Sequence, residues 1–184
     1  MLLAKSRDLY RWEKVKGFEL SAPAYLEMHD YRDPFVYYDD NTQKFCMLLA
    51  GRAKTDGPFN GKGVTLKLHS DDLLHWQLCK EPFYAPGAFY THECPDLFQM
   101  GNWWYLVFSE FSDKVVTTYR MSKSPDGPWI TPKNNTFDCY TYYAAKTASD
   151  GEHRYLFGWN RIKNHERDDQ PGQWGGTIVV HELV

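Results

Sequence analysis

The stretch RDPFVYYDDNTQKFCMLLAG, residues 32–51, decides the fold class. Its first half is rich in the aromatic and β-branched residues that favour strands, and Asp39-Asp40-Asn41 is typical of a turn. The second half is an almost unbroken apolar run from Phe45 to Ala50, as expected of a strand that is buried on both faces. The stretch therefore predicts a β-hairpin.

The same pattern recurs twice further along the chain. ECPDLFQMGNWWYLVFS, residues 93–109, has its turn at Gly101-Asn102, and YYAAKTASDGEHRYLFGW, residues 142–159, has its turn at Ser149-Asp150-Gly151. Because Gly, Pro, Asn and Asp interrupt the chain at short intervals, we expect no long helices. The chain is therefore predicted to be built from repeated hairpins.

A serine-rich turn that ends on a tryptophan closes each repeat. It is found as SRDLYRW at residues 6–12, SDDLLHW at residues 70–76 and SPDGPW at residues 124–129. Radial repetition of small sheets predicts an all-β fold of the β-propeller type, with blades packed face to face. A β-sandwich with similar strand spacing is the alternative.

Composition excludes several classes of partner. With 21 Lys and Arg against 24 Asp and Glu, the formal charge is −3, so we expect no nucleic acid or anionic lipid partner. No apolar run is long enough to span a bilayer, and residues 1–5 are too short for a signal peptide core. The four cysteines (Cys46, Cys79, Cys94 and Cys139) lack the spacing of a disulfide framework or a zinc site, so we expect free thiols. Thirteen Tyr, eleven Phe and seven Trp suit sheets and sugar-binding surfaces.

Asp33 and Glu93 lie where the innermost strands of two blades would begin. We expect their positions to correspond and both carboxylates to face one funnel on the propeller axis. Glycosidic bond cleavage needs such a pair, because one acid protonates the leaving oxygen while a second carboxylate acts as nucleophile or base. Taken singly, Arg32-Asp33-Pro34 is also explained as a turn with an ion pair, and Glu93-Cys94-Pro95-Asp96 as a capped strand entry.

Four motifs in this order resemble glycoside hydrolase family 32, the group of invertases, inulinases and levanases. They are Tyr31-Arg32-Asp33-Pro34, Glu93-Cys94-Pro95-Asp96-Leu97-Phe98, Tyr143-Ala144-Ala145 and Gly158-Trp159. The resemblance covers nearly the whole chain and implies a five-bladed propeller followed by a β-sandwich, of which 184 residues supply about three blades. We expect one partial propeller domain, with the end of one blade at residues 1–12 and three blades at residues 13–76, 77–129 and 130–184.

The resemblance also implies a role for five residues. Glu93 would be the general acid/base, and Asp33 would stabilise the transition state by gripping sugar hydroxyls as the ring flattens toward an oxocarbenium ion. Arg32 would hydrogen-bond the same sugar. Cys94 would support Glu93, or be only a small buried side chain. Trp159 would line the sugar pocket with its ring face, or only pack within its blade.

This chain also departs from the family pattern. The family's nucleophile is the Asp of a Trp-Met-Asn-Asp-Pro-Asn-Gly stretch, but no Asn-Asp-Pro sequence occurs here, so we expect the nucleophile to be encoded upstream or on a lost segment. Asp30 is a poor substitute, because it neighbours Asp33 instead of lying on a separate blade. Thr141 and Lys146 replace an acid and an amide of the family, and Trp174-Gly175-Gly176 is followed by Val180-His181 instead of Pro-Arg. These exchanges leave fructose specificity open.

The sequence thus predicts a retaining, β-fructofuranosidase-like glycoside hydrolase acting on sucrose or fructans. The alternatives are a non-catalytic carbohydrate-binding propeller fragment and a related propeller hydrolase that acts on arabinose- or xylose-containing glycans. We expect no cofactor and no metal, since His92-Glu93-Cys94 has no second His or Cys at ligand spacing. The expected partner is an oligo- or polysaccharide, together with self-association, because an open arc of blades exposes apolar faces.

Overall fold

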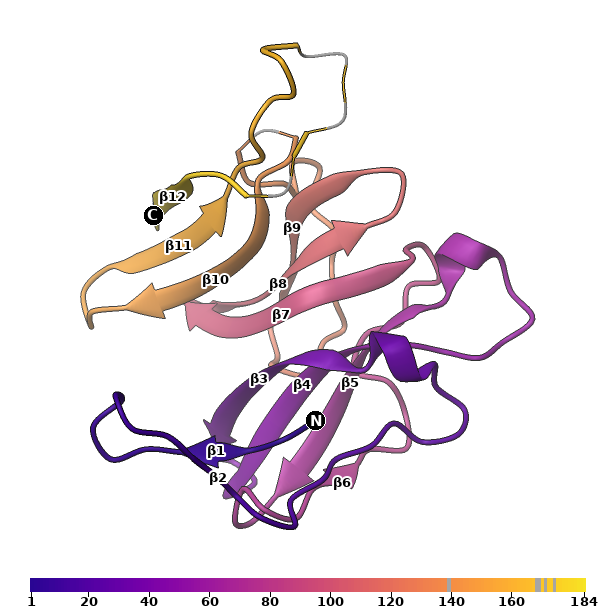
Figure 1. Cartoon of the computed structure of the whole chain (residues 1–184), viewed down its shortest axis with the longest axis vertical. Helices are drawn as coiled ribbons and strands as arrows, with labels where there is room; N and C mark the ends of the chain where they lie inside the picture. Colours follow the sequence, from indigo (N-terminus) through magenta and orange to yellow (C-terminus); the bar gives the residue numbers. More distant parts are fainter. Residues whose placement is uncertain (139, 168–169, 171, 174) are drawn as a thin grey trace.

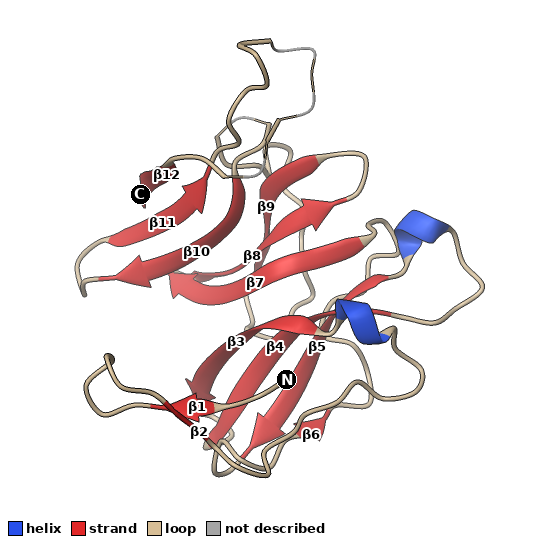
Figure 2. Ribbon diagram, viewed as in Figure 1, coloured by secondary structure: helices blue, strands red, loops and turns tan. Residues whose placement is uncertain are grey.

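β-strands make up almost all the regular structure of this protein (Figures 1 and 2). The computed structural model describes residues 1–138, 140–167, 170, 172–173 and 175–184. The helices in these residues are two short 3-10 turns, η1 (Met28–Asp30) and η2 (Phe59–Gly61). The all-β prediction is confirmed, whereas Cys139 and Trp174, named in the sequence analysis, lie outside the described residues.

Within the described residues, four antiparallel sheets follow one another along the chain. The first pairs β1 (Ala4–Lys5) with β2 (Glu13–Lys14). The second has the order β3 (Arg32–Asp39), β4 (Lys44–Arg52), β5 (Gly63–Ser70) and β6 (Gln77–Leu78). The third contains β7 (Thr91–Met100), β8 (Trp103–Phe111) and β9 (Val115–Ser122). The fourth contains β10 (Tyr143–Ser149), β11 (Arg154–Trp159) and β12 (Ile178–Leu183).

The three predicted hairpins are present as β3–β4, β7–β8 and β10–β11. Each forms the start of one sheet, and the next strand continues the same up-and-down order. The blade limits in sequence stay a prediction. In one detail the pairing differs from the predicted segments: β2 (Glu13–Lys14) pairs back onto β1, so the first sheet extends beyond residue 12.

The apolar run of β4 is buried on both faces, as its sequence predicts. Met47 and Leu49 face a cluster with Leu66 and Leu68 of β5, which the N-terminal segment covers. Leu48, between them, faces the opposite way and packs against the β7–β9 sheet. This alternation lets one sheet pack against a neighbour on each side, which is how propeller blades stack.

Two of the serine-rich turns have the same hydrogen bonds. Ser6 and Ser70 each accept backbone N–H groups two and three residues ahead, and the indole that ends each turn donates to a leucine carbonyl at 3.0 Å. Leu9 and Leu73 occupy the same left-handed position, with φ of 63° and 65°. The repeat predicted from sequence is therefore a repeat of local structure as well.

The inner strands of the three larger sheets lie next to each other. Figure 1 shows β7 beside β3 on one side and beside β10 on the other, and both neighbours contact it. The start of each inner strand therefore points into one shared region, where the predicted site residues lie.

Candidate active site

Each inner strand begins with the same irregularity. The register of pairing shifts between Arg32 and Phe35 in β3, between Glu93 and Asp96 in β7, and between Tyr143 and Lys146 in β10. In each strand, the residue directly after the start of the shift has a left-handed backbone. These residues are Asp33, Cys94 and Ala144, with φ of 59°, 50° and 53°. Bulges of this kind redirect side chains at the end of a strand, and they are common next to active sites.

The bulges correct one prediction. Asp33 and Glu93 do not occupy corresponding positions. In β3 the residue before the left-handed position is Arg32, and in β7 it is Glu93. Asp33 corresponds to Cys94. The two motifs still meet: the Cys94 backbone N–H donates to Asp33 Oδ2 at 3.1 Å, and Arg32 Nη2 lies 2.5 Å from Glu93 Oε1.

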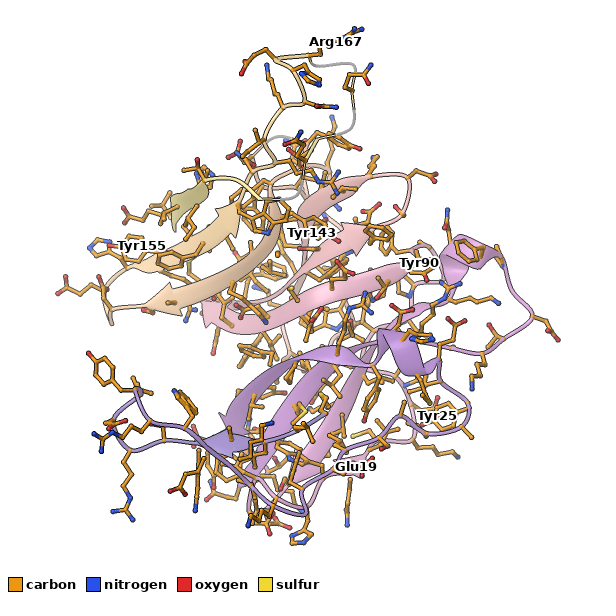
Figure 3. All side chains as sticks on the ribbon, viewed as in Figure 1. Glu19, Tyr25, Tyr90, Tyr143, Tyr155 and Arg167 are labelled. Carbon is orange, nitrogen blue, oxygen red and sulfur yellow. The ribbon has the colours of Figure 1, made fainter. Side chains whose placement is uncertain are left out.

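Both oxygens of the Glu93 carboxylate have a protein partner. Arg32 donates to Oε1, and the Tyr143 hydroxyl donates to Oε2 at 2.5 Å. Figure 3 shows Tyr143 in the middle of the molecule, among the strands of the upper sheets. Burial, and after it the neighbouring Glu93, raise the pKa of Tyr143, so its phenol keeps its proton and remains a donor. Arg32, Glu93 and Tyr143 thus form a row, one from each inner strand.

Arg32 lies between carboxylates. It pairs with Asp30 and with Glu93, and its Nε lies 3.9 Å from Asp33 Oδ2. Partial burial acts to lower the pKa of Arg32, but hydrogen bonds and charge attraction to Asp30 and Glu93 outweigh it, and the net shift is upward. The guanidinium is therefore a fixed positive charge beside both predicted catalytic residues.

Cys94 completes the contact between the two motifs. Its Sγ lies 3.8 Å from Asp33 Oδ2, and burial, followed by the Asp33 charge, raises the pKa of this thiol to about 12. Cys94 is therefore a neutral thiol that faces a carboxylate. Among the described cysteines, Cys46, Cys79 and Cys94 are free, which confirms the prediction for these three.

A second row, which the sequence analysis missed, lies next to the first. Lys146 Nζ donates to the Pro95 carbonyl at 2.6 Å and lies 5.2 Å from the centroid of the Phe35 ring. Burial lowers the pKa of Lys146 and raises that of Asp96, whose Oδ2 accepts the Thr147 backbone N–H at 2.6 Å. Phe35, Asp96 and Lys146 are the first residues after the three register shifts, so a signal for this row was present in the aligned motifs.

Trp159 lies at the edge of this arrangement. It ends β11 and is the register partner of Tyr143, and the two rings meet edge to face with their centroids 6.2 Å apart. Its predicted contact with sugar stays a prediction. Within the described residues, no group of three or more His, Cys, Asp or Glu side chains could hold a metal ion, and no helix is long and apolar enough to cross a membrane.

Comparison with known proteins adds to this geometry. Raffinose invertase of Escherichia coli is 35% identical over 108 residues, covering 58% of this chain and 21% of that protein. Fructan 6-exohydrolase of Triticum aestivum is 26% identical over 195 residues, covering 88% of this chain and 32% of that protein. This chain therefore spans between a fifth and a third of the length of these two curated relatives.

Solved structures share the fold. A GH32 β-fructofuranosidase of Bombyx mori matches with a TM-score of 0.74 at 23% identity, over 99% of this chain and 41% of that one. A sucrose-6-phosphate hydrolase of Lactobacillus gasseri matches with a TM-score of 0.71 at 19% identity, over 99% of this chain and 40% of that one. The shared architecture is of the β-propeller type, as the repeats predict.

The family itself is shown by the sequence. The model of the "Glycosyl hydrolases family 32 N-terminal domain" matches residues 1–182, which is nearly the whole chain. That span includes both motifs that meet in the candidate site. This chain belongs to glycosyl hydrolase family 32.

Proposed function

We propose that this chain carries the acid/base and the transition-state stabiliser of a retaining, β-fructofuranosidase-like hydrolase that acts on sucrose or fructans. One observation carries the proposal, namely that the two motifs meet: Arg32 pairs at 2.5 Å with Glu93, 61 residues away in sequence, and the Cys94 N–H donates to Asp33. The names of the relatives, raffinose invertase and fructan exohydrolase, support a fructose-containing substrate.

In this mechanism Glu93 donates a proton to the glycosidic oxygen as the bond breaks. Its side chain is 18% exposed and held from two sides by Arg32 and Tyr143, so its direction is set before substrate binds. Asp33, fixed by the Cys94 N–H, would hold sugar hydroxyls through bonds that strengthen as positive charge develops on the ring. Trp159 would offer a ring face to the sugar.

A retaining reaction needs a second carboxylate about 5 to 5.5 Å from the acid. The 184 residues contain no Asn-Asp-Pro sequence to supply the nucleophile of the family resemblance. We therefore propose that the nucleophile comes from outside these residues and that Glu93 and Asp33 act with it. Hydrolysis is accordingly expected of a protein that includes that carboxylate.

The test is hydrolysis of sucrose, inulin and levan by such an extended protein. Glu93→Gln is expected to lower kcat on these sugars by at least about a thousandfold, and far less on an aryl fructoside whose leaving group needs no proton. Asp71→Asn, at an exposed ion pair with Lys44, is the matched control. Full activity of Glu93→Gln on sucrose and on fructans would contradict the proposal.

A non-catalytic sugar-binding role is the second candidate, because both Glu93 oxygens are already bound by Arg32 and Tyr143. Calorimetry on the 184-residue chain with fructans, arabino-oligosaccharides and xylo-oligosaccharides separates the alternatives. Binding without hydrolysis by the extended protein favours this role, and binding of pentose chains alone favours the arabinose or xylose alternative.

A further inference from the structure

Asp30 is a buried carboxylate next to the site that neither motif contains. It is the last residue of η1 and is 5% exposed. Arg32 Nη1 donates to its Oδ1, and also to the His29 carbonyl at 3.0 Å. The Tyr90 hydroxyl lies 3.5 Å from its Oδ2. A carboxylate so far removed from water needs partners of this kind.

Tyr90 is itself held firmly, so it gives Asp30 a fixed support. The guanidinium carbon of Arg52 lies 3.9 Å from the centroid of the Tyr90 ring, and Arg52 is almost completely buried. Arg52 also donates to the carbonyls of Phe59 and Tyr90 at 2.8 and 3.0 Å, and to Glu27 Oε2 at 3.0 Å. Figure 3 shows Tyr90 beside η2.

The contacts of Arg32 are divided between two sides. Nη1 faces Asp30, whereas Nη2 faces Glu93, so the fork makes one hydrogen bond to Glu93 instead of two. Without the Asp30 charge, the guanidinium could turn and form the bidentate pair that Arg and carboxylate groups prefer. Such a pair would turn both oxygens of Glu93 toward the guanidinium and away from a leaving group.

We propose that Asp30 is a positioning residue: by holding Nη1 of Arg32, it limits the guanidinium to a single contact with Glu93 and so keeps that carboxyl group available for proton transfer. The role in proton transfer rests on the proposed function. The hold of Asp30 on Arg32 does not, and it is testable in the 184-residue chain alone.

The first experiment observes arginine side chains by NMR in the wild-type chain and in Asp30→Asn, Asp30→Glu and Asp71→Asn. The wild-type chain is expected to show separate, slowly exchanging Nη–H signals for Arg32. Asp30→Asn should lose these signals, whereas Asp30→Glu should show them at a shifted frequency. Asp71→Asn should leave them unchanged. The signals of buried Arg52 report that each variant is folded. Arg32 signals that stay at wild-type frequencies in Asp30→Asn would overturn the proposal. If that variant does not fold, the absence of separate, slowly exchanging Arg32 signals in the wild-type chain overturns it.

The second experiment measures kinetics in the extended protein on sucrose. Asp30→Asn is expected to lower kcat by about tenfold, because the acid step is affected, while a smaller rise in KM would report the predicted contact of Arg32 with the sugar. An unchanged kcat would overturn the link to proton transfer. A wild-type protein that neither binds nor hydrolyses fructosides would instead remove the proposed function, while the NMR result would still decide the role of Asp30.

Discussion

The environment of Cys94 makes a direct prediction at the scale of one residue. Its thiol pKa of about 12, raised by burial and by Asp33, leaves about one thiolate in a thousand at pH 9. Iodoacetamide should therefore label Cys94 much more slowly than the cysteines of the unfolded chain. Asp33→Asn should speed the labelling, because it removes the negative charge 3.8 Å from Sγ.

Peptide mass spectrometry after timed labelling at several pH values checks this prediction residue by residue. Cys79, which is also free, serves as the internal comparison in the same digest. Labelling of Cys94 at pH 9 as fast in the folded as in the unfolded protein would contradict the predicted environment.

At this scale the sequence predicts which residues come together but not their geometry. Asp33 and Glu93 are predicted to face one region, and the structure places both carboxylates beside Arg32. The prediction that Asp33 corresponds to Glu93 was wrong. Both motifs place a proline directly after the left-handed residue, and aligning these prolines pairs Arg32 with Glu93. The contact of Tyr143 with Glu93 could not be read from spacing, because it depends on how far the β10 bulge turns the side chain.

At the scale of elements, the bulges at the inner strands position the site residues. Ala144 lies in the β10 bulge, so a substitution there measures the backbone strain of the bulge. A β-branched residue is strongly disfavoured at its φ of 53°, so Ala144→Val should destabilise the fold by about 1–3 kcal/mol. Ala148→Val, at an exposed extended position of the same strand, should be close to neutral. Urea unfolding of both variants measures the difference, and equal stabilities would show that the bulge imposes no backbone strain.

His92, at the contact between neighbouring sheets, is expected to make the stability of the fold depend on pH. His92 of β7 is fully buried, and its Nδ1 lies 3.2 Å from the Thr65 hydroxyl of β5. Its ring packs at a tilt against Phe108 of β8, with Arg120 of β9 nearby. Burial, with the Arg120 charge, lowers the pKa of His92 from 6.5 to about 3. The unfolded chain therefore binds a proton in this range that the folded chain does not bind. Stability should fall as pH drops from about 6.5 to about 3, by up to about 1.4 kcal/mol per pH unit.

Urea unfolding at a series of pH values isolates this contribution by comparison with His92→Gln, which cannot titrate. The difference in unfolding free energy between wild type and His92→Gln should shrink as pH falls through this range. A difference that does not change with pH would mean that His92 is protonated in the folded state.

The hairpins illustrate what local sequence decides at the scale of elements. Asp39-Asp40-Asn41 and Gly101-Asn102 allow tight reversals, and the apolar runs after them require burial on two faces, so both hairpins follow from local chemistry. Local sequence does not determine which sheets lie next to each other, because β7 contacts β3 and β10 through residues that are far apart in sequence.

For the whole molecule, the described chain has apolar surface at both ends. Phe157, Ile178 and Val180 are 40%, 70% and 48% exposed on the outer face of the β11–β12 pair. An apolar groove of about 550 Å³ lies at the other end, between the N-terminal segment and the β3–β4 hairpin, and includes Val36 and Met47. Blades normally cover such faces with a neighbouring blade. The two ends together predict that isolated copies of this chain associate with each other.

Sedimentation velocity over a wide range of protein concentration is the test of this association. The sedimentation coefficient of wild type should rise with concentration, because dimers form by mass action. Val180→Lys places a charge in the middle of the exposed β11–β12 face, where Phe157 is its cross-strand partner, and should weaken association without changing the fold. Glu152→Lys, in the exposed turn between β10 and β11, adds positive charge away from that face and should leave association unchanged. A wild-type chain that stays monomeric at every concentration would mean that the exposed apolar surface is too small to hold a second copy.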